Sequence, residues 1–369
     1  MISSKEISVI VQGAVDKTTP RCLKSVRRHL PDAEIILSTW EGADTAGLSY
    51  DRVIFNSDPG GIKYDPYNTN NINRQLLSTQ SGLAKAARPY VLKLRSDLAL
   101  SGCGFLRQFD KYPAYDEKYR LFSCRLLTNL LFSIKFEEAA KGKRHWLPFH
   151  VSDWWYFGRR EDILKLFDVP LVAEPGYTRY FETHDKPKYK VEVFPLRLWR
   201  MSPEQYLLSS LVKKQFPSTR FEHMLDYDSD NIEMSARIVV NNYQILSPQK
   251  SGIRILKRKY GGARYRNMLD GTCRDGLYHE LVWLADYQRF CDASFVMPHH
   301  WPQKLECERE YAKAKEHLGK LTINFERFHS QVIPTVIYSL RMFYAIARHY
   351  VHIARRHLSP SFGVNQPRQ

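Results

Sequence analysis

Four short apolar segments in the first hundred residues most constrain the fold of this chain. The central residues of each segment are mainly apolar rather than alternating, and polar residues follow them at the end of the segment or directly after it. The segments are residues 7–13, 34–42, 51–61 and 90–94. Uniformly apolar strands are typical of a parallel sheet that helices cover on both faces. Helix-like segments at 19–30 and 75–87 separate the strands, so the order predicts an α/β fold with an open, mostly parallel sheet flanked by helices.

The thirty residues from 71 to 100 carry the strongest functional signal. Asn73 and Arg74 open a helix, and Asp97 follows the strand that ends near Arg95. Open α/β sheets bind ligands beyond the carboxyl ends of their strands, where helix N-termini also offer N–H groups to anions. Cations and a carboxylate at such an edge predict a sugar-nucleotide site. Each residue alone also fits an ordinary role, as a turn residue or as a solvated cation.

Polar residues at the ends of the other strands extend this predicted site. Gln12 ends the first apolar segment, Glu41 the second, and Asp58 lies in the third before Pro-Gly-Gly. Parallel strands place their carboxyl ends at one edge of the sheet, so we expect these side chains to lie near one another. The residues predicted to bind the nucleotide are Gln12, Glu41, Asp58, Asn73, Arg74 and Arg95.

The central third of the chain contains the residues predicted to bind the acceptor, the molecule that receives the sugar. Residues 152–167 begin with Asp153, continue through an aromatic strand and enter a helix. Transfer of a sugar with inversion at its anomeric carbon needs a carboxylate that deprotonates the attacking hydroxyl of the acceptor. Asp153 is the first candidate for this catalytic base. Glu204 is the second candidate. Ser202 and Pro203 before it also predict an ordinary helix start, where an acid is favoured by the helix dipole.

The aromatic strand itself has two interpretations. Trp154, Trp155 and Tyr156 are able to stack on sugar rings through their faces. Alternation along a strand instead sends some of these side chains into the core, and for each one taken singly core packing is the simpler prediction.

Seven segments of the chain together resemble a known family. In order they are ISVIVQGAV, PDAEIILSTWEG, DRVIFNSDPGG, NINRQLLSTQSGL, YVLKLRSDL, SDWWYFGRREDILKLF and MSPEQYLLSSLV. This set resembles the WavE-type lipopolysaccharide synthesis proteins of Gram-negative bacteria, and no motif matches after about residue 240. The resemblance implies a glycosyltransferase with a GT-A-like fold. It would move a sugar from a nucleotide-sugar donor to a lipopolysaccharide core or another cell-surface polysaccharide, including lipid-linked acceptors.

The metal site that such a fold usually carries is incomplete in this sequence. Enzymes of the GT-A kind usually have an Asp-x-Asp motif after a strand, and the matching place here reads Arg95-Ser96-Asp97. The resemblance therefore implies Asp97 as a ligand of a divalent Mn²⁺ or Mg²⁺, completed by the diphosphate and water. The alternative is that Arg95 or Arg74 neutralises the diphosphate directly.

The charge of the chain indicates an anionic partner. The net charge is +16 and the pI is about 9.5. Residues 333–357 predict a basic amphipathic helix that either lies on an anionic inner-membrane surface or packs on the core with a solvated arginine stripe. A non-enzymatic basic protein that binds nucleic acid or an anionic membrane face is the alternative function. Nucleic acid is not expected as a partner, because no interleaved basic and aromatic recognition motif is present.

The length of the chain and the changes in composition along it predict three regions. They are a GT-A-like domain over 1–240, a mixed extension with a basic loop over 241–330, and the basic helix with its tail over 331–369. The cysteines are scattered without metal-site spacing, which predicts free thiols in a reducing compartment. With no apolar leader and no run long enough to span a bilayer, we expect a cytoplasmic protein that is peripheral on the inner membrane.

Overall fold

The computed structural model describes most of the first three hundred residues. The described residues are 2–64, 68–138, 144–188, 197–256 and 276–297, together with 340, 343, 344, 347, 348 and 351. The chain divides into two compact units, one formed by 1–260 with 275–296 and the other by 261–274 with 297–369. The three regions expected from the sequence, with boundaries at residues 240 and 330, stay a prediction. Most of the basic loop expected at 250–267 lies outside the described residues.

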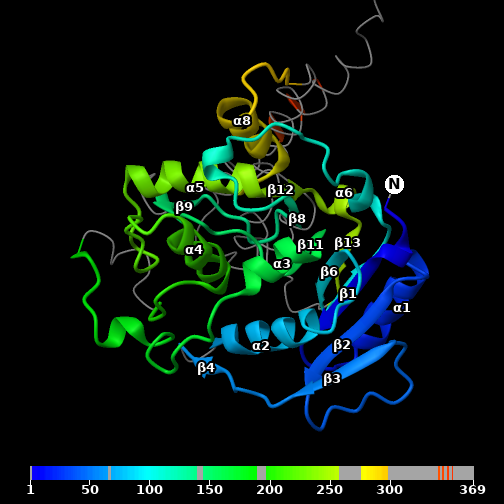
Figure 1. Cartoon of the computed structure of the whole chain (residues 1–369). Helices are drawn as coiled ribbons and strands as arrows, with labels where there is room; N and C mark the ends of the chain where they lie inside the picture. Colours follow the sequence, from blue (N-terminus) through cyan, green and yellow to red (C-terminus); the bar gives the residue numbers. More distant parts are fainter. Residues whose placement is uncertain are drawn as a thin grey trace, which may run out of the picture. The chain divides into compact units, whose positions relative to one another are not determined.

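A seven-stranded sheet forms the centre of the first unit (Figure 1). Its strands lie in the order β12-β8-β11-β6-β1-β2-β3. The strands are β1 (Ile7–Gln12), β2 (Glu34–Trp40), β3 (Arg52–Asn56), β6 (Tyr90–Arg95), β8 (Leu126–Asn129), β11 (Trp155–Arg159) and β12 (Tyr243–Leu246). β11 is antiparallel to β6 and β8, and the other neighbours pair in parallel. The predicted open, mostly parallel α/β sheet is therefore confirmed.

Helices and short strands complete the described part of this unit. The α-helices are α1 (Thr19–His29), α2 (Ile72–Leu83), α3 (Arg160–Phe167), α4 (Pro203–Gln215), α5 (Ser229–Asn242), α6 (Pro248–Ser251) and α8 (Glu280–Phe290). The 3₁₀ turns are η1 (Ser4–Glu6), η2 (Gly104–Arg107), η3 (Glu117–Tyr119) and η5 (Tyr180–Glu182). The short strands are β4 (Ile62–Lys63), β5 (Thr69–Asn70), β7 (Leu98–Leu100), β9 (Phe136–Glu138), β10 (Arg144–Trp146) and β13 (Ile253–Ile255).

The starts of two helices follow from local side-chain chemistry. Ser202 caps α4 by accepting a hydrogen bond from the backbone N–H of Gln205 at 3.2 Å, and Pro203 occupies the first helical position. This start has the form predicted from the sequence. Asp228 caps α5 in the same way, with its carboxylate accepting from the N–H of Asn231 at 2.8 Å. Both caps satisfy N–H groups that the helix itself leaves unpaired.

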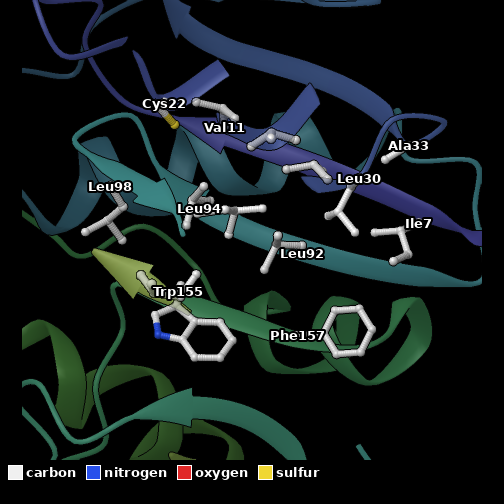
Figure 2. Packing of buried hydrophobic residues seen from close by; sticks show 14 of the residues in the cluster. Ile7, Val11, Cys22, Leu30, Ala33, Leu92, Leu94, Leu98, Trp155 and Phe157 are labelled. Atoms are coloured by element: carbon white, nitrogen blue, oxygen red, sulfur yellow. The ribbon is translucent and has the colours of Figure 1, made fainter. Parts of the chain in front are cut away.

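One face of the sheet packs an apolar core against α1. Val9 pairs in register with Leu92, and Val11 with Leu94, so these side chains emerge on the same face. All four are fully buried, together with Cys22 of α1. Figure 2 shows this cluster, with Leu92 and Leu94 beside Trp155 and Phe157 of β11. The core therefore arises from alternate residues of strands that are apolar along most of their length.

The opposite face of the sheet packs against α2. A Cβ atom added at Gly82 would lie only 2.4 Å from a methyl carbon of Ile10. The helix therefore lies so close to β1 that only glycine fits at this contact. Ile10 pairs in register with Lys93, and Gln12 with Arg95, so this second face carries polar side chains toward its carboxyl edge.

The second unit is described at a few positions only. Residues 340, 343, 344, 347, 348 and 351 are helical and exposed. Among them Leu340, Phe343 and Tyr344 have about two-thirds of their surface in solvent, at 65%, 64% and 67%. The predicted helix at 333–357 thus has helical backbone at the positions that can be described. No helix in the described part of the chain has the length and apolarity needed to cross a bilayer.

Candidate active site

A group of buried and half-buried ionisable side chains lies at the carboxyl edge of the sheet, on the face covered by α2. Lys93 and Arg95 belong to β6, and Asp153 precedes β11, whose amino end lies at this edge because the strand is antiparallel. Glu204 comes from the first turn of α4. Open α/β sheets hold their ligands at this edge, so the group is the candidate active site.

Lys93 is the most unusual member of the site. Its side chain is fully buried, and its ammonium group donates a hydrogen bond to the backbone carbonyl of Asp153. The ammonium also lies 5.9 Å from the ring centre of Tyr156 and 5.8 Å from that of Phe167. Burial lowers the pKa of Lys93 to about 7, although the neighbouring charge of Asp153 acts in the opposite direction. A lysine with this pKa changes its charge near neutral pH.

Two donors from different elements converge on the Asp153 carbonyl. Besides Lys93, the side-chain amide of Gln75 in α2 donates to it at 3.2 Å. Asp153 itself is 4% exposed. Its peptide is therefore held by β6 and by α2 at once, which fixes the direction in which its carboxylate leaves the backbone.

Glu204 and His150 form a second buried contact. Burial, reinforced by the neighbouring charge of Asp153, raises the pKa of Glu204 to about 8. Burial also lowers the pKa of His150 to about 4, even though its Nδ1 bonds the Phe132 carbonyl at 2.8 Å. That bond places the imidazole hydrogen on Nδ1, which leaves Nε2 as an acceptor 3.9 Å from Glu204 Oε2. At neutral pH the contact thus joins a neutral acid to a neutral base rather than two ions.

Arg95 and Asp97 form a bidentate pair beside these groups. The guanidinium donates to the two carboxylate oxygens of Asp97 at 3.0 and 2.6 Å. Its central carbon also lies 4.1 Å from the ring centre of Trp154. Asp97 is 2% exposed, whereas the side chain of Arg95 is 27% exposed. Arg95 is therefore the more accessible member of the pair.

The aromatic residues after Asp153 belong to the core. Trp154, Trp155 and Tyr156 are 4%, 0% and 1% exposed. Trp154 stacks on Phe132, with ring centres 5.1 Å apart, and Arg95 lies over the same indole. None of the three offers a free face to a sugar ring, so core packing is the correct interpretation of this strand.

Asn73 and Arg74 lie where the sequence predicted, in the first turn of α2, but both already have protein partners. The Asn73 amide bonds the backbone of Val172 twice, at 3.0 Å through its nitrogen and at 2.8 Å through its oxygen. Arg74 makes a bidentate pair with Asp58, with both distances 2.7 Å. The Arg74 guanidinium is the main cause that holds the pKa of the Asp58 carboxyl below its usual range. Asp58 and Arg74 are thus brought together, as a surface ion pair.

The two remaining predicted nucleotide-binding residues differ in setting. Gln12 is buried at the carboxyl end of β1, where its side-chain oxygen accepts from the Ser78 hydroxyl of α2 at 2.8 Å. Glu41 follows β2 and is exposed to solvent. Gln12 therefore borders the buried group through β6, whereas the backbone N–H of Glu41 donates to the Asn56 carbonyl of β3, on the other side of β2.

The described residues do not form a conventional metal site. In the described part of the chain, no three His, Cys, Asp or Glu side chains are grouped to hold a cation. Asp97, the predicted ligand, gives both carboxylate oxygens to Arg95. A divalent ion prefers several oxygen ligands, so it would have to displace this guanidinium.

The sequence analysis missed Lys93, His150 and Gln75. Lys93 did leave a signal, because it is the one charged residue inside the apolar run of residues 90–94. A charged residue within a strand that is buried on both faces needs a specific partner. His150 and Gln75 left no comparable signal in the sequence.

The described cavities lie away from this group. One of about 790 Å³ is lined by η3, the start of α5 and the residues after α4. Another of about 360 Å³ lies between Trp146, α5 and α8. Neither is lined by a residue of the candidate site. The candidate site is identified by its chemistry and its place on the sheet.

The fold and this site define an α/β protein with a buried ionisable group at the carboxyl edge of a mostly parallel sheet. A family model described as WavE lipopolysaccharide synthesis matches residues 7–304. Because this match covers most of the chain, the protein belongs to the WavE lipopolysaccharide synthesis family. This confirms the family resemblance predicted from the seven sequence segments.

Comparison with other proteins adds little beyond the family. No curated protein matches the chain. The apo-form glycosyltransferase GlyE of Streptococcus pneumoniae TIGR4 is 13% identical over 76% of this chain and 59% of its own, with a TM-score of 0.30. The galactosyltransferase LgtC, in complex with donor and acceptor sugar analogues, is 12% identical over 80% of this chain and 100% of its own, also with a TM-score of 0.30. At this TM-score neither likeness assigns a residue or an activity to the protein.

Proposed function

We propose that this protein is a nucleotide-sugar-dependent glycosyltransferase of GT-A-like fold that acts in lipopolysaccharide synthesis. The observation that carries the proposal is the buried group of Lys93, Asp153 and Glu204 at the carboxyl edge of the sheet, in a chain of the WavE family. Ionisable groups are costly to bury, and strongly shifted pKa values cluster at functional sites. The acceptor is a lipopolysaccharide core or another cell-surface polysaccharide.

Asp153 is the proposed catalytic base. The acceptor hydroxyl attacks the anomeric carbon, the bond from that carbon to the diphosphate oxygen breaks, and the nucleoside diphosphate leaves with the electron pair. The hydroxyl proton passes to the Asp153 carboxylate. Glu204 is less suited to this step, because its raised pKa keeps it protonated at neutral pH. It instead serves as a hydrogen-bond donor beside Asp153.

Lys93 and Gln75 are the proposed positioning residues for the base. Both donate to the backbone carbonyl of Asp153, so neither needs to touch substrate. Removal of either donor would leave the Asp153 peptide less tightly held. Small displacements of a catalytic group lower the rate strongly, since the reacting atoms must be aligned.

On the donor side, we propose that Arg95 neutralises the diphosphate. It is the more accessible member of its pair with Asp97, and a guanidinium suits bidentate binding of phosphate. Arg74 and Asn73 would contribute at the N-terminus of α2, with Arg74 exchanging Asp58 for the phosphate. Gln12 and Glu41 would border the nucleoside. A Mn²⁺ or Mg²⁺ ion at Asp97 is the alternative, and it requires Arg95 to turn away.

The C-terminal helix is the proposed membrane contact. Its described apolar side chains are exposed, and the sequence after Glu326 contains no acidic residue. A basic helix with an exposed apolar face binds anionic bilayers through both features. We therefore propose that the protein is cytoplasmic and peripheral on the inner membrane. Sedimentation with phosphatidylglycerol vesicles, but not with phosphatidylcholine vesicles, checks this, and Leu340→Glu with Phe343→Glu should abolish it.

The proposed donor site is tested by thermal stabilisation. Purified protein is mixed with UDP, GDP, CDP and CMP sugars, with and without Mn²⁺, because a ligand that binds only the native state raises the melting temperature. The measurement is repeated on Arg95→Gln and Asp97→Asn. Asp51→Asn is the matched control, since both carboxylate oxygens of Asp51 also accept from an arginine, here from the single Nη2 of Arg27.

The outcomes separate the two donor models. A metal-independent shift that disappears in Arg95→Gln supports direct neutralisation of the diphosphate. A shift that requires Mn²⁺ and disappears in Asp97→Asn supports the metal alternative instead. If no nucleotide sugar shifts the melting temperature, the glycosyltransferase proposal fails, and binding of a nucleic acid or an anionic membrane becomes the function to test.

A further inference from the structure

A small cavity opens at the other end of β6, away from the candidate active site. Its volume is about 280 Å³, and Arg88, Arg159 and Arg160 line it together with Glu161. Arg88 precedes β6, while Arg159 and Arg160 join β11 to α3. Three guanidinium groups face one carboxylate, so the cavity carries net positive charge.

No ion pair involves the arginines of this cavity within the described residues, although Arg159 hydrogen-bonds the Cys124 side chain and is near Asp162. In the part of the chain that the structure describes, no carboxylate lies within 4.0 Å of a side-chain nitrogen of Arg88, Arg159 or Arg160. The Nε atom of Arg160 is buried and has no hydrogen-bond partner. A buried donor of this kind normally has an acceptor, because leaving it unpaired is energetically costly.

The N-terminus of α3 also lies at this cavity, with Glu161 and Asp162 in its first turn. Arg159 occupies the N-cap position with extended backbone and makes no side-chain cap. The Asp162 carboxylate, in the first turn, is turned away to accept from the N–H groups of Ser123 and Cys124 at 2.8 and 3.2 Å. The first turn of α3 therefore has no side-chain cap, and an uncapped helix N-terminus favours an anion.

We infer that this cavity binds a phosphate group carried by the acceptor saccharide. Guanidinium groups bind phosphate through paired, charge-assisted hydrogen bonds, and the cavity is large enough for a phosphate ester with part of a sugar. β6 spans Tyr90 to Arg95, which at roughly 3.3 Å per residue places this cavity ~17 Å from Arg95. It is therefore separate from the proposed donor site.

The inference rests on the proposed function only for the identity of the phosphate carrier. Phosphate binding by the three arginines follows from the cavity alone. The saccharide carrier follows from the proposed transfer to a polysaccharide, in which an anchor some distance from the reacting hydroxyl would hold a large acceptor in place. A lipid headgroup presents the same phosphate chemistry, so the experiment must separate the two carriers.

Titration calorimetry with the full-length protein tests the site. The probes are inorganic phosphate, glucose 6-phosphate and glucose, and the variant is Arg88→Gln with Arg159→Gln, two exposed residues whose replacement should leave the fold intact. The control is Arg21→Gln with Arg28→Gln, which removes the same charge from two exposed positions of α1. We expect glucose 6-phosphate to bind, glucose not to bind, and the cavity variant to lose roughly tenfold or more in affinity while the control stays near wild type.

Each result supports or overturns the inference. Equal weakening in the cavity variant and the control shows only a general charge effect and overturns the site. If the wild type binds neither phosphate probe, the site is also overturned. Arg160→Lys provides a second variant, because it keeps the positive charge but loses the paired N–H donors of the guanidinium group. It should weaken phosphate binding without loss of stability.

Binding to lipid vesicles distinguishes a saccharide carrier of the phosphate from a lipid carrier. Loss of binding to phosphatidic acid vesicles in the cavity variant, without any binding of glucose 6-phosphate, overturns the saccharide carrier. The nucleotide-sugar shift of melting temperature is measured on the same variant. If that shift persists while glucose 6-phosphate binding is lost, the two sites are independent, and the proposed transfer activity stands or falls separately.

Discussion

The two faces of the central sheet differ in composition although the same strands form both. On the α1 face, Val11 and Leu94 are fully buried among apolar side chains. On the α2 face, the neighbouring positions are Gln12, Lys93 and Arg95. The first face stabilises the fold by burying apolar surface, at about 25 cal/mol per Å².

The polar face gives up part of that stabilisation. A fully buried lysine is costly, and here its hydrogen bond goes to a backbone carbonyl rather than to a carboxylate. Residues that break the rules of local packing commonly mark function. One face of the sheet therefore maintains the fold, and the other maintains the geometry of Asp153. Four measurements test this contrast.

The largest expected effect is on catalysis. Asp153→Asn keeps the size of the side chain but removes the base, so the rate of sugar transfer should fall by about 10²–10⁴-fold. The rate is measured as release of nucleoside diphosphate in the presence of acceptor. Asp51→Asn, at the amino end of β3, should retain near wild-type turnover. A comparable loss in both variants would show that Asp153 acts through stability rather than through chemistry.

A large effect on stability is expected on the apolar face. Leu94→Ala should lower the free energy of unfolding by about 2–5 kcal/mol, because the side chain is fully buried. Lys93→Met, at the adjacent position on the other face, should cost far less stability, since an apolar side chain replaces a desolvated cation. Its transfer rate per folded molecule should nevertheless fall. Urea unfolding with turnover measures both, and the reverse pattern would contradict the division between the faces.

A smaller effect is expected at the contact between α2 and β1. Gly82→Ala places a methyl group against Ile10 and should lower the free energy of unfolding by about 1–3 kcal/mol through overpacking. Gly102→Ala is the control, because a Cβ atom there meets no heavy atom within 4 Å. If thermal melts show both variants equally stable, α2 is free to move away from β1, and its hold on Asp153 through Gln75 is loose.

The smallest effects are pH dependences of opposite sign. The folded protein holds the Glu204 proton up to about pH 8, so this group's contribution to stability falls as pH rises from about 4.5 to 8. Lys93 is lowered to about 7, so its contribution instead rises between pH 7 and 10.5. Urea titrations of wild type against Glu204→Gln and Lys93→Met, repeated across pH 4 to 10, should therefore give difference curves of opposite slope. Parallel or flat curves would contradict the burial of both charges.

Several features of the fold were predictable because their causes are local in the sequence. Uniform apolar runs located β1, β2 and β6, and Ser202 with Pro203 located the start of α4. The helix at α2 was predicted too, although it begins at Ile72 and ends at Leu83 rather than covering 75–87. The polar residues at the carboxyl end of β6 were also correctly placed. These features depend on periodicity and capping over a few residues.

The partners of the site residues were not predictable in the same way. Asn73 fitted a phosphate-binding helix start, yet its amide bonds the backbone of Val172, 99 residues away. Asp97 was suited to bind a metal, yet Arg95 donates hydrogen bonds to both of its carboxylate oxygens. In each case the residue type suited the predicted ligand, and the same donors and acceptors also suit protein partners.

The sequence by itself determined the family, the order of strands and helices in the first hundred residues, and the edge of the sheet where the polar residues gather. Only the tertiary structure decided which of those residues are buried together. Lys93 meets the Asp153 carbonyl across 60 residues of chain, and His150 meets Glu204 across two different elements. The pKa values of Lys93 and Glu204 depend on the water and the charges that such packing removes or adds, and no local pattern specifies them.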